Sequence, residues 1–326
     1  MSEPYTQLTQ LNQGAQPQVD QGPQPQAPQA ADEAEARPIP INLYRHAAPL
    51  MVDVVENRRL TSPDNPNDVR HVVLRYPVKQ YQFLEGQSAG IPPPGLNHRG
   101  RPHVPRLYSI ASGRDGDDGQ ATSLSLCVKR VIWVDENGVE QRGLASNLLC
   151  DAQVGSKLPM TGPAGKEFIL PLPGHGPLIL VATGTGIAPF RAFAQRWLQL
   201  PPEQRAPIWL FFGVQTADDL LYADEWREME KHAGFDVSYA LSRQQKTADG
   251  RRLYVQERMR LAGAPLWDWI VQPDTQIFIC GIKGMEVGIA ESLVELAQTH
   301  GKPGQNDWPA IQAEMAMQRR WHLEVY

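Results

Sequence analysis

The sequence predicts a two-domain protein in which an antiparallel β-barrel is followed by an α/β domain built on a parallel sheet. Three changes of pattern along its 326 residues support this fold class. Residues 1–38 are rich in Gln, Pro and Ala, with almost no large apolar residues after Leu11, so we expect a disordered tail. Residues 39–172 alternate short strand-like runs with turns, as small barrels do. Residues 173–326 alternate apolar runs with helical stretches, which is typical of a parallel sheet covered by helices.

Short runs of alternating apolar and polar residues predict the strands of the first domain. Strands are expected over residues 49–59, 70–76, 106–111 and 123–134. Asn137-Gly138 lies between Trp133 and Gln141, and this dipeptide is a strong signal for a hairpin turn. One helical segment, residues 145–150, interrupts the strands.

Longer apolar runs and helical stretches justify the elements of the second domain. Buried parallel strands are expected over residues 178–182, 208–212, 237–241 and 277–280. Helices are expected over residues 190–200, 222–233, 255–261, 284–298 and 308–319. A short last strand, residues 321–326, completes the chain.

The composition argues against several functional classes. The formal net charge of −5 at pH 7 argues against nucleic acid as a partner. No apolar run approaches the length of a membrane span, and no secretory signal is expected. Cys127, Cys150 and Cys280 are odd in number and widely spaced, which favours a reducing compartment. They cannot supply the four thiolates of an iron–sulfur cluster, and we expect no metal site in this chain. The tail contains Asp32, Glu33 and Glu35 and so differs from acid-poor transit peptides, and we expect a bacterial cytoplasmic protein.

The segment Arg106-Leu-Tyr-Ser-Ile-Ala-Ser112 favours a flavin nucleotide. An arginine offers a bidentate fork for a pyrophosphate, and a tyrosine offers a flat face for an aromatic ring. A serine adds a small hydrogen-bond donor beside that ring. Alone, the same pattern also fits an ordinary strand with a polar edge.

A second motif, Thr183-Gly-Thr-Gly-Ile-Ala-Pro189, follows an apolar run and precedes an expected helix. Its glycines permit a tight turn and the close approach of a phosphate, and the free amides of a helix N-terminus attract anions. Pro189 suits the first turn of that helix. The spacing is G-x-G-x-x-P rather than G-x-G-x-x-G, and a plain strand–turn–helix connection is the alternative. We interpret the motif as a dinucleotide pyrophosphate site.

Polar residues after the expected strand 237–241 favour NADP over NAD. Ser242, Arg243 and Arg252 supply a hydroxyl and two guanidinium groups, which suit a 2′-phosphate, and the ring of Tyr254 can stack on a purine. NAD would need a carboxylate to bind the ribose diol, and residues 242–248 contain none. Ordinary arginines in a solvated surface turn remain the alternative.

Together these motifs resemble the plant-type ferredoxin–NADP(+) reductases over residues 41–326. The other segments that carry the resemblance are Glu85-Gly-Gln-Ser-Ala-Gly-Ile91, Ser125-Leu-Cys-Val-Lys-Arg130, Gly143-Leu-Ala-Ser-Asn147, Thr161-Gly-Pro-Ala-Gly-Lys166, Tyr254-Val-Gln256, Cys280-Gly-Ile-Lys-Gly-Met285 and Glu324-Val-Tyr326. The resemblance implies that residues 39–172 bind FAD and residues 173–326 bind NADP(H). It also implies an oxidoreductase that passes electrons between NADP(H) and ferredoxin or flavodoxin, with hydride transfer between the nicotinamide and flavin N5.

The resemblance assigns roles to individual residues. The catalytic residues would be Ser109, Cys280, Glu324 and Tyr326, with Tyr326 stacked on the flavin where the nicotinamide must bind. The residues expected to bind FAD are Arg106, Leu107, Tyr108, Ser109, Cys127, Val128, Lys129, Trp133, Gly143, Leu144, Ala145, Ser146, Thr185 and Tyr326. The residues expected to bind NADP(H) are Lys129, Thr185, Gly186, Ser242, Arg243, Arg252, Tyr254, Gln256, Gly281, Met285 and Glu324. The family has a tyrosine at the position of Trp133 and commonly a lysine at that of Arg252, so the aromatic ring and the charge are kept.

A ferredoxin is usually acidic, so its docking face on this protein should be basic. Arg99 and Arg101, just ahead of Arg106, are the first candidates, and Arg319 and Arg320 could add to them. Two alternative functions stay open at this point. One is an NADPH-dependent reductase component of an oxygenase system, and the other is a non-catalytic flavin-binding scaffold protein.

Overall fold

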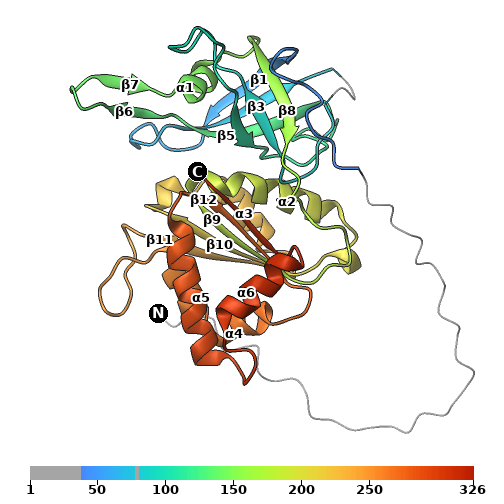
Figure 1. Cartoon of the computed structure of the whole chain (residues 1–326), viewed down its shortest axis with the longest axis vertical. Helices are drawn as coiled ribbons and strands as arrows, with labels where there is room; N and C mark the ends of the chain where they lie inside the picture. Colours follow the sequence, from blue (N-terminus) through green and yellow to red (C-terminus); the bar gives the residue numbers. More distant parts are fainter. Residues whose placement is uncertain (1–37, 78–80) are drawn as a thin grey trace, which may run out of the picture. The chain divides into compact units, whose positions relative to one another are not determined.

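The first half of the fold is a six-stranded antiparallel sheet that closes into a barrel. A computed structural model describes residues 38–77 and 81–326. The strands are β1 (Leu50–Arg59), β2 (Val69–Arg75), β3 (Ser88–Ile91), β4 (Arg106–Ser109), β5 (Ser123–Lys129) and β8 (Lys157–Ala164), in the spatial order β4-β3-β8-β1-β2-β5 (Figure 1). Ile110, immediately after β4, forms an antiparallel bridge with Leu126 of β5, and this bridge joins the two ends of the sheet.

A hairpin and one helix stand between β5 and β8. Strands β6 (Ile132–Val134) and β7 (Glu140–Arg142) pair with each other, and Trp133 lies opposite Gln141, as predicted. In the connection between these two strands, the Asp135 carboxylate accepts hydrogen bonds from the amides of Asn137 and Val139. Helix α1 (Leu144–Asp151) follows directly.

The second half is a parallel sheet with helices on both faces. Its strands are β9 (Leu178–Thr183), β10 (Ile208–Val214), β11 (Phe235–Leu241), β12 (Gln276–Gly281) and β13 (Trp321–Val325), in the order β11-β10-β9-β12-β13. The helices are α2 (Ala188–Gln199), α3 (Ala223–Met229), α4 (Val255–Ile270), α5 (Met285–His300) and α6 (Trp308–Met317) (Figure 1). The short 3₁₀ turns η1 (Gly184–Ile187), η2 (Pro202–Gln204) and η3 (Ala217–Asp219) complete the connections.

Alternate residues of the parallel strands supply two separate cores. Leu180 and Phe278 pack with aromatic residues of α2 and α3 on one face. Val181 and Ile279, one position further along the same strands, pack with α4, α5 and α6 on the other face. A strand that is buried on both faces must be apolar at successive positions, which explains why these runs are continuous in the sequence.

Strand β5 links the barrel to the parallel sheet because both of its faces are buried. Leu124, Leu126 and Val128 point into the barrel core. Cys127 points the other way, into the core that contains Phe212 and Cys280 of the parallel sheet. The end of β5, at Lys129, is therefore held close to the parallel sheet.

The fold class is confirmed, and the predicted strands and helices are present with small shifts of their ends. The prediction of one strand over residues 123–134 is wrong, because the chain leaves the ladder at Arg130, whose side chain turns to Asp68 and Asp151. Strands β3 and β8 were not predicted. The first is short and contains Gly90, and the second carries Pro159 and Pro163, which are unfavourable in strands.

Helix α4 is longer than predicted. It runs past residue 261 to Ile270, through a kink at Gly263, where φ is 56°, and past Pro265. Gly263 and Pro265 are unfavourable in a helix, so the sequence pattern indicates that the helix ends before them. Burial of Leu266, Trp267 and Ile270 favours continuation of the helix beyond these residues.

The predicted domain boundaries stay a prediction. Contacts group Ile39–Tyr326 into one compact unit that contains both sheets. The expected tail lies almost wholly in residues 1–37, outside the described residues. Within residues 38–77 and 81–326, no helix is long and apolar enough to cross a membrane.

A buried arginine on α2 connects the two halves of the fold. Arg191 is 6% exposed, and its Nη1 donates to the carbonyl of Ala111 (2.9 Å) and to Asp117 (2.7 Å). Its Nε donates to Glu225 on α3 (2.7 Å). Burial alone would raise the pKa of Asp117, but a hydrogen bond from His71 and the charge of Arg191 outweigh it and hold that pKa well below its usual range.

We therefore expect Arg191→Met to lower the free energy of unfolding by about 2–3 kcal/mol, because it removes the buried guanidinium on which the Ala111 carbonyl and the Asp117 and Glu225 carboxylates converge. Urea unfolding followed by circular dichroism measures the change. Arg196→Met, on the same helix but bonded only to Gln199, is the matched control. Equal stability of the two variants would contradict a structural role for the buried Arg191.

Candidate functional site

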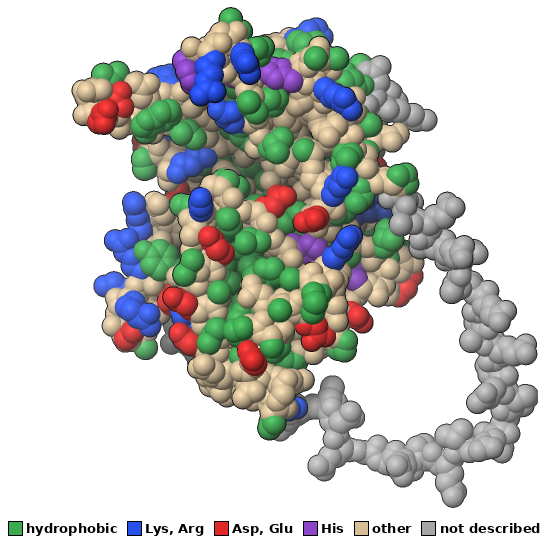
Figure 2. Space-filling model, viewed as in Figure 1, with side chains coloured by type: hydrophobic (Ala, Val, Ile, Leu, Met, Phe, Trp, Pro, Cys, Tyr) green, Lys and Arg blue, Asp and Glu red, His purple; other side chains and the backbone are tan. Residues whose placement is uncertain are grey.

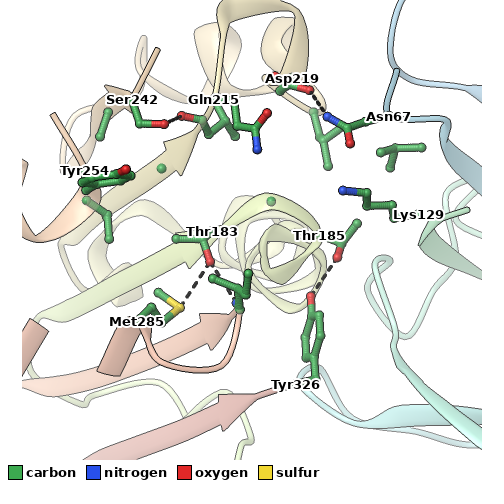
Figure 3. A pocket seen from close by; sticks show the side chains of 18 of the residues that line it. Asn67, Lys129, Thr183, Thr185, Gln215, Asp219, Ser242, Tyr254, Met285 and Tyr326 are labelled. Atoms are coloured by element: carbon green, nitrogen blue, oxygen red, sulfur yellow. Dashed lines mark hydrogen bonds between the residues drawn. The ribbon is translucent and has the colours of Figure 1, made fainter. Parts of the chain in front are cut away.

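A cavity of about 550 Å³ opens at the carboxyl ends of the parallel strands (Figure 3). Its lining from the parallel domain comes from the last residues of β9, β10 and β11 and from the connections that follow β9, β10, β11 and β12, and the barrel contributes residues at the end of β5 and the start of β2. Strand order reverses between β9 and β12, and ligands of open α/β sheets bind at such a switch point. The lining residues are Asn67, Val69, Lys129, Thr183, Gly184, Thr185, Gly213, Val214, Gln215, Asp219, Leu221, Ala240, Ser242, Tyr254, Val255, Gln256, Ile282, Met285 and Tyr326.

The turn after β9 brings backbone amides to this cavity. Gly184 has φ of 54°, and the chain passes through η1 straight into α2, with Pro189 in its first turn. A Cβ on Gly186 would lie 2.1 Å from the carbonyl oxygen of Cys280, so this glycine lets the turn pack against β12. No side chain caps the helix, and its first turn holds no acidic residue. An anion is therefore the natural partner for these amides.

Thr183 joins the turn after β9 to the turn after β12. Its hydroxyl accepts a hydrogen bond from the amide of Ile282 (3.0 Å) and lies 3.2 Å from the sulfur of Met285 (Figure 3). These contacts hold one wall of the cavity rigid.

The structure brings together only part of the residues predicted for NADP(H). Those that line the cavity are Lys129, Thr185, Ser242, Tyr254, Gln256 and Met285. Gly186 and Gly281 pack behind the turn, and Glu324 is not part of the lining. Arg243 lines an adjoining cavity that shares Asn67, Gln215 and Asp219 with the first, and Arg252 is exposed and lines neither.

The C-terminal residue closes one end of the cavity. The Tyr326 hydroxyl lies 2.9 Å from the Thr185 hydroxyl, while its ring belongs to a side chain that is 61% exposed (Figure 3). Its amide donates to the carbonyl of Gly281, and its own carbonyl accepts from the amide of Lys283. Three hydrogen bonds therefore hold a residue that would otherwise be a free chain end.

The other predicted catalytic residues lie around the ends of β12 and β13. Cys280 and Glu324 are partners in the parallel pairing of these strands. Cys280 is fully buried, which raises the pKa of its thiol; the nearby Glu324 adds to this, and the Ser109 hydroxyl opposes it. Burial raises the pKa of Glu324 to about 7. Ser109, Cys280 and Glu324 thus form a group in which the thiol is fully buried and the hydroxyl and the carboxyl are half-buried.

The barrel presents a surface that fits a flavin nucleotide. Arg106 and Leu107 are exposed on β4, and Tyr108 beside them is half-buried. Trp133 is 49% exposed on the β6–β7 hairpin, as a flat apolar face that a ring could cover. Gly143 caps α1 without a side-chain hydrogen bond, which leaves the amides of the first helical turn free for an anion.

Several residues predicted for FAD have side chains that face inward. Cys127, Val128 and Ala145 are buried in the two cores. The Ser146 hydroxyl donates to the carbonyl of Gly143 (3.2 Å) and accepts from the amide of Val131 (3.2 Å). Contacts of these four residues with a ligand would have to come mainly from their backbone. Leu144 is 48% exposed and is free to make side-chain contacts.

The predicted docking residues separate into two groups. Arg99 and Arg101 are exposed in the connection between β3 and β4, and Figure 2 shows Lys, Arg and His side chains gathered over the barrel. Arg319 and Arg320 precede β13, so they stand at the opposite end of that strand from Tyr326. Arg320 also donates to the carbonyl of Thr275 (2.9 Å). The structure does not bring this second pair to the edge where the cavity lies.

Sequence reasoning missed eight residues of the cavity wall, which are Asn67, Val69, Gly213, Val214, Gln215, Asp219, Leu221 and Ala240. Four of them lie in strands β2, β10 and β11 and four in the connections, and no sequence motif marks any of them as part of a site. Among the described residues, no group of three or more His, Cys, Asp or Glu side chains could hold a metal ion.

Comparisons with known proteins agree with this geometry. The family model described as "Oxidoreductase NAD-binding domain" matches residues 180–291. A ferredoxin–NADP reductase from Synechocystis sp. is 40% identical over 299 residues, which is 90% of this chain and 71% of the relative. A chloroplastic ferredoxin–NADP reductase from Spinacia oleracea is 36% identical over 293 residues, which is 88% of this chain and 78% of the relative.

A solved structure gives the same picture. The ferredoxin–NADP+ reductase from Plasmodium falciparum superimposes with a TM-score of 0.68 at 26% sequence identity. The similarity covers 88% of this chain and 100% of that chain, so it includes the barrel and the parallel sheet together.

The raised pKa of Glu324 makes stability depend on pH. Its pKa rises on folding from 4.5 to about 7, so the folded state holds the proton more tightly than the unfolded state. This contribution is fully present below pH 4.5 and is lost as the pH rises to 7. We expect Glu324→Gln to remove this loss, which we put at about 2–3 kcal/mol.

Urea unfolding of both proteins at pH 4.5 and pH 8 measures this difference. Glu314→Gln, a change in α6 at a carboxylate that is bonded only to Gln318, is the control. Parallel pH dependence in the wild type and Glu324→Gln would contradict a buried carboxyl at this position.

Proposed function

The chain belongs to the ferredoxin–NADP reductase family, and we propose that its cavity binds NADP(H) while the outer face of its barrel binds FAD. The protein is accordingly an oxidoreductase that moves electrons between NADP(H) and ferredoxin. Residues 39–172 would form the FAD-binding domain and residues 173–326 the NADP-binding domain. The same chemistry would serve flavodoxin as an alternative carrier.

One observation carries this proposal more than any other. Tyr326 lines the dinucleotide cavity and follows β13 two residues after Glu324, beside the group of Ser109, Cys280 and Glu324, and its hydroxyl is bonded to Thr185 of the phosphate-binding turn. A chain end held in this position separates the place for a nicotinamide from the place for a flavin.

The barrel residues suit FAD in charge and shape. Arg106 and the free amides at the start of α1 would bind its pyrophosphate, while Tyr108 and Trp133 would cover its rings. FAD exchanges a hydride with a nicotinamide and single electrons with an iron–sulfur carrier, which is the conversion that this reaction requires. The protein supplies the alignment of the two cofactors and the exclusion of water.

The residues around Tyr326 would perform the remaining tasks. Tyr326 keeps the nicotinamide position closed until the cofactor displaces it, so release of the Thr185 hydrogen bond is the gating event. Cys280 and Ser109 keep the reacting edge dry. Glu324, with a pKa of about 7, can hold or release a proton there at physiological pH.

Recognition of the 2′-phosphate would begin with Ser242 and Tyr254, which lie in the cavity wall. Arg243, which lines the adjoining cavity, and the exposed Arg252 would supply the positive charge. Arg99 and Arg101 would form the basic docking face for an acidic ferredoxin. We retain the bacterial cytoplasm as the expected location.

Anaerobic stopped-flow absorbance tests the function directly. We expect the purified protein to be yellow and NADPH to bleach its flavin at least about tenfold faster than NADH, because only NADPH carries the phosphate that the arginines bind. Equal rates would remove the proposed roles of Ser242, Arg243 and Arg252. A colourless protein with no response to either cofactor would refute the function.

Tyr326→Ser should tighten NADP+ binding by about tenfold or more, because the closed state no longer competes with the nicotinamide. Its preference for NADPH over NADH should fall, since NADH lacks the 2′-phosphate contacts, depends more on the nicotinamide position, and so gains more when that position is open. Tyr326→Phe keeps the ring and loses only the bond to Thr185, so it should lie between the wild type and Tyr326→Ser. Unchanged affinity for both cofactors in Tyr326→Ser would contradict the gate.

A further inference from the structure

A loop of the barrel is bonded across to the parallel domain beside the dinucleotide cavity. The loop is residues 60–68, between β1 and β2, and its partner is η3, which follows β10. Asn67 Nδ2 and Asn65 Nδ2 both donate to Asp219 Oδ1, each at 3.0 Å. Ser62 Oγ (2.7 Å) and Asn65 Nδ2 (2.6 Å) donate to Asp218. We refer to this set of hydrogen bonds as the clasp.

Hydrogen bonds within the loop and within η3 hold each side of the clasp in position. In the loop, Asn65 Oδ1 accepts from the amide of Asn67 (2.8 Å), and Thr61 Oγ1 donates to the carbonyl of Asn67 (2.5 Å). In η3, Asp219 Oδ2 accepts from the amide and the hydroxyl of Thr216, at 3.1 and 2.8 Å. The clasp is therefore a rigid contact and not a chance meeting of surface side chains.

Asp219 is a charged group in the cavity wall. Burial alone would raise its pKa, but the hydrogen bonds from Thr216, Asn65 and Asn67 outweigh it and hold that pKa below its usual value. The carboxylate accepts four hydrogen bonds, two on each oxygen, so most of its lone pairs face protein donors.

The Asn67–Asp219 part of the clasp lies within the cavity lining. Asn67 comes from the barrel and Asp219 from the parallel domain, so this bond joins the two walls directly. Figure 3 shows the Asn67 and Lys129 side chains on the barrel side, with Asp219 bonded to Asn67. Lys129 is the cation of that wall, and a ligand phosphate near it would also be near Asp219.

We propose that the Asn67–Asp219 bond is a positioning element for NADP(H). It holds the barrel wall and the sheet wall at the separation that admits the diphosphate, and it keeps the Asp219 lone pairs on protein donors. A carboxylate without these donors would repel the ligand phosphates more strongly. Asn67 therefore supplies one of the four hydrogen bonds that weaken the repulsion between this carboxylate and a ligand phosphate. This inference rests on the proposed placement of NADP(H) in the cavity.

The test is a set of variants of the full-length, FAD-loaded protein titrated with NADP+ by isothermal calorimetry. We expect Asn67→Ala to weaken NADP+ binding by about tenfold at low ionic strength and by less at 0.3 M salt, because screening reduces the repulsion. Adding Asp219→Asn to Asn67→Ala should restore most of the affinity, because the amide has the shape of the carboxylate without its charge.

Ser62→Ala is the matched control. Ser62 belongs to the same loop and the same clasp, but it bonds to Asp218 and does not line the dinucleotide cavity. Its affinity for NADP+ should stay within about twofold of the wild type. Asn67→Ser, a smaller change that also removes the amide donor, replaces Asn67→Ala if the latter loses FAD or unfolds.

The outcomes separate the inference from the function on which it rests. A wild type that does not bind NADP+ at all would refute the proposed function. A wild type that binds, with equal losses in Asn67→Ala and Ser62→Ala, would show that the clasp only stabilises the interface and would overturn the inference. Failure of Asp219→Asn to restore affinity would overturn the electrostatic part of it.

Discussion

Burial of β5 on both of its faces is the constraint on which the rest of this structure depends. Leu124, Leu126 and Val128 close the barrel, while Cys127 belongs to the core of the parallel domain. A slip of one residue would exchange the two faces and bury the wrong side chains in both cores at once. The register of β5 is therefore strongly specified, and with it the position of Lys129 at the cavity.

Polar contacts give the two halves their mutual orientation. Apolar packing around β5 brings the halves together without favouring one angle, whereas the bonds of Arg191 to Ala111, Asp117 and Glu225 require one arrangement. The clasp at Asn67 and Asp219 adds a second fixed point beside the cavity. Two such points are needed because one contact still allows rotation about itself.

Local motifs could be predicted from the sequence, and contacts between distant segments could not. The turn Thr183–Pro189 was predictable because its glycines and proline carry their own backbone preferences. Strands β3 and β8 escaped prediction because their glycine and prolines disfavour the conformation that the barrel imposes. Asn67 and Asp219 are 152 positions apart, and residues of these types are common in turns, so nothing in the sequence indicates that they share a cavity wall.

The sequence by itself determined the order of the two folded parts, the phosphate-binding turn and the resemblance that brought Ser109, Cys280, Glu324 and Tyr326 together as one group. These features depend on residue types and on spacing along the chain. Only the tertiary structure decided that Arg243 lies in an adjoining cavity, that Arg319 and Arg320 stand at the far end of β13, and that Glu324 is buried enough to titrate near pH 7. Burial and neighbouring charge are properties of the packed chain, and a side chain acquires them only when segments distant in sequence meet.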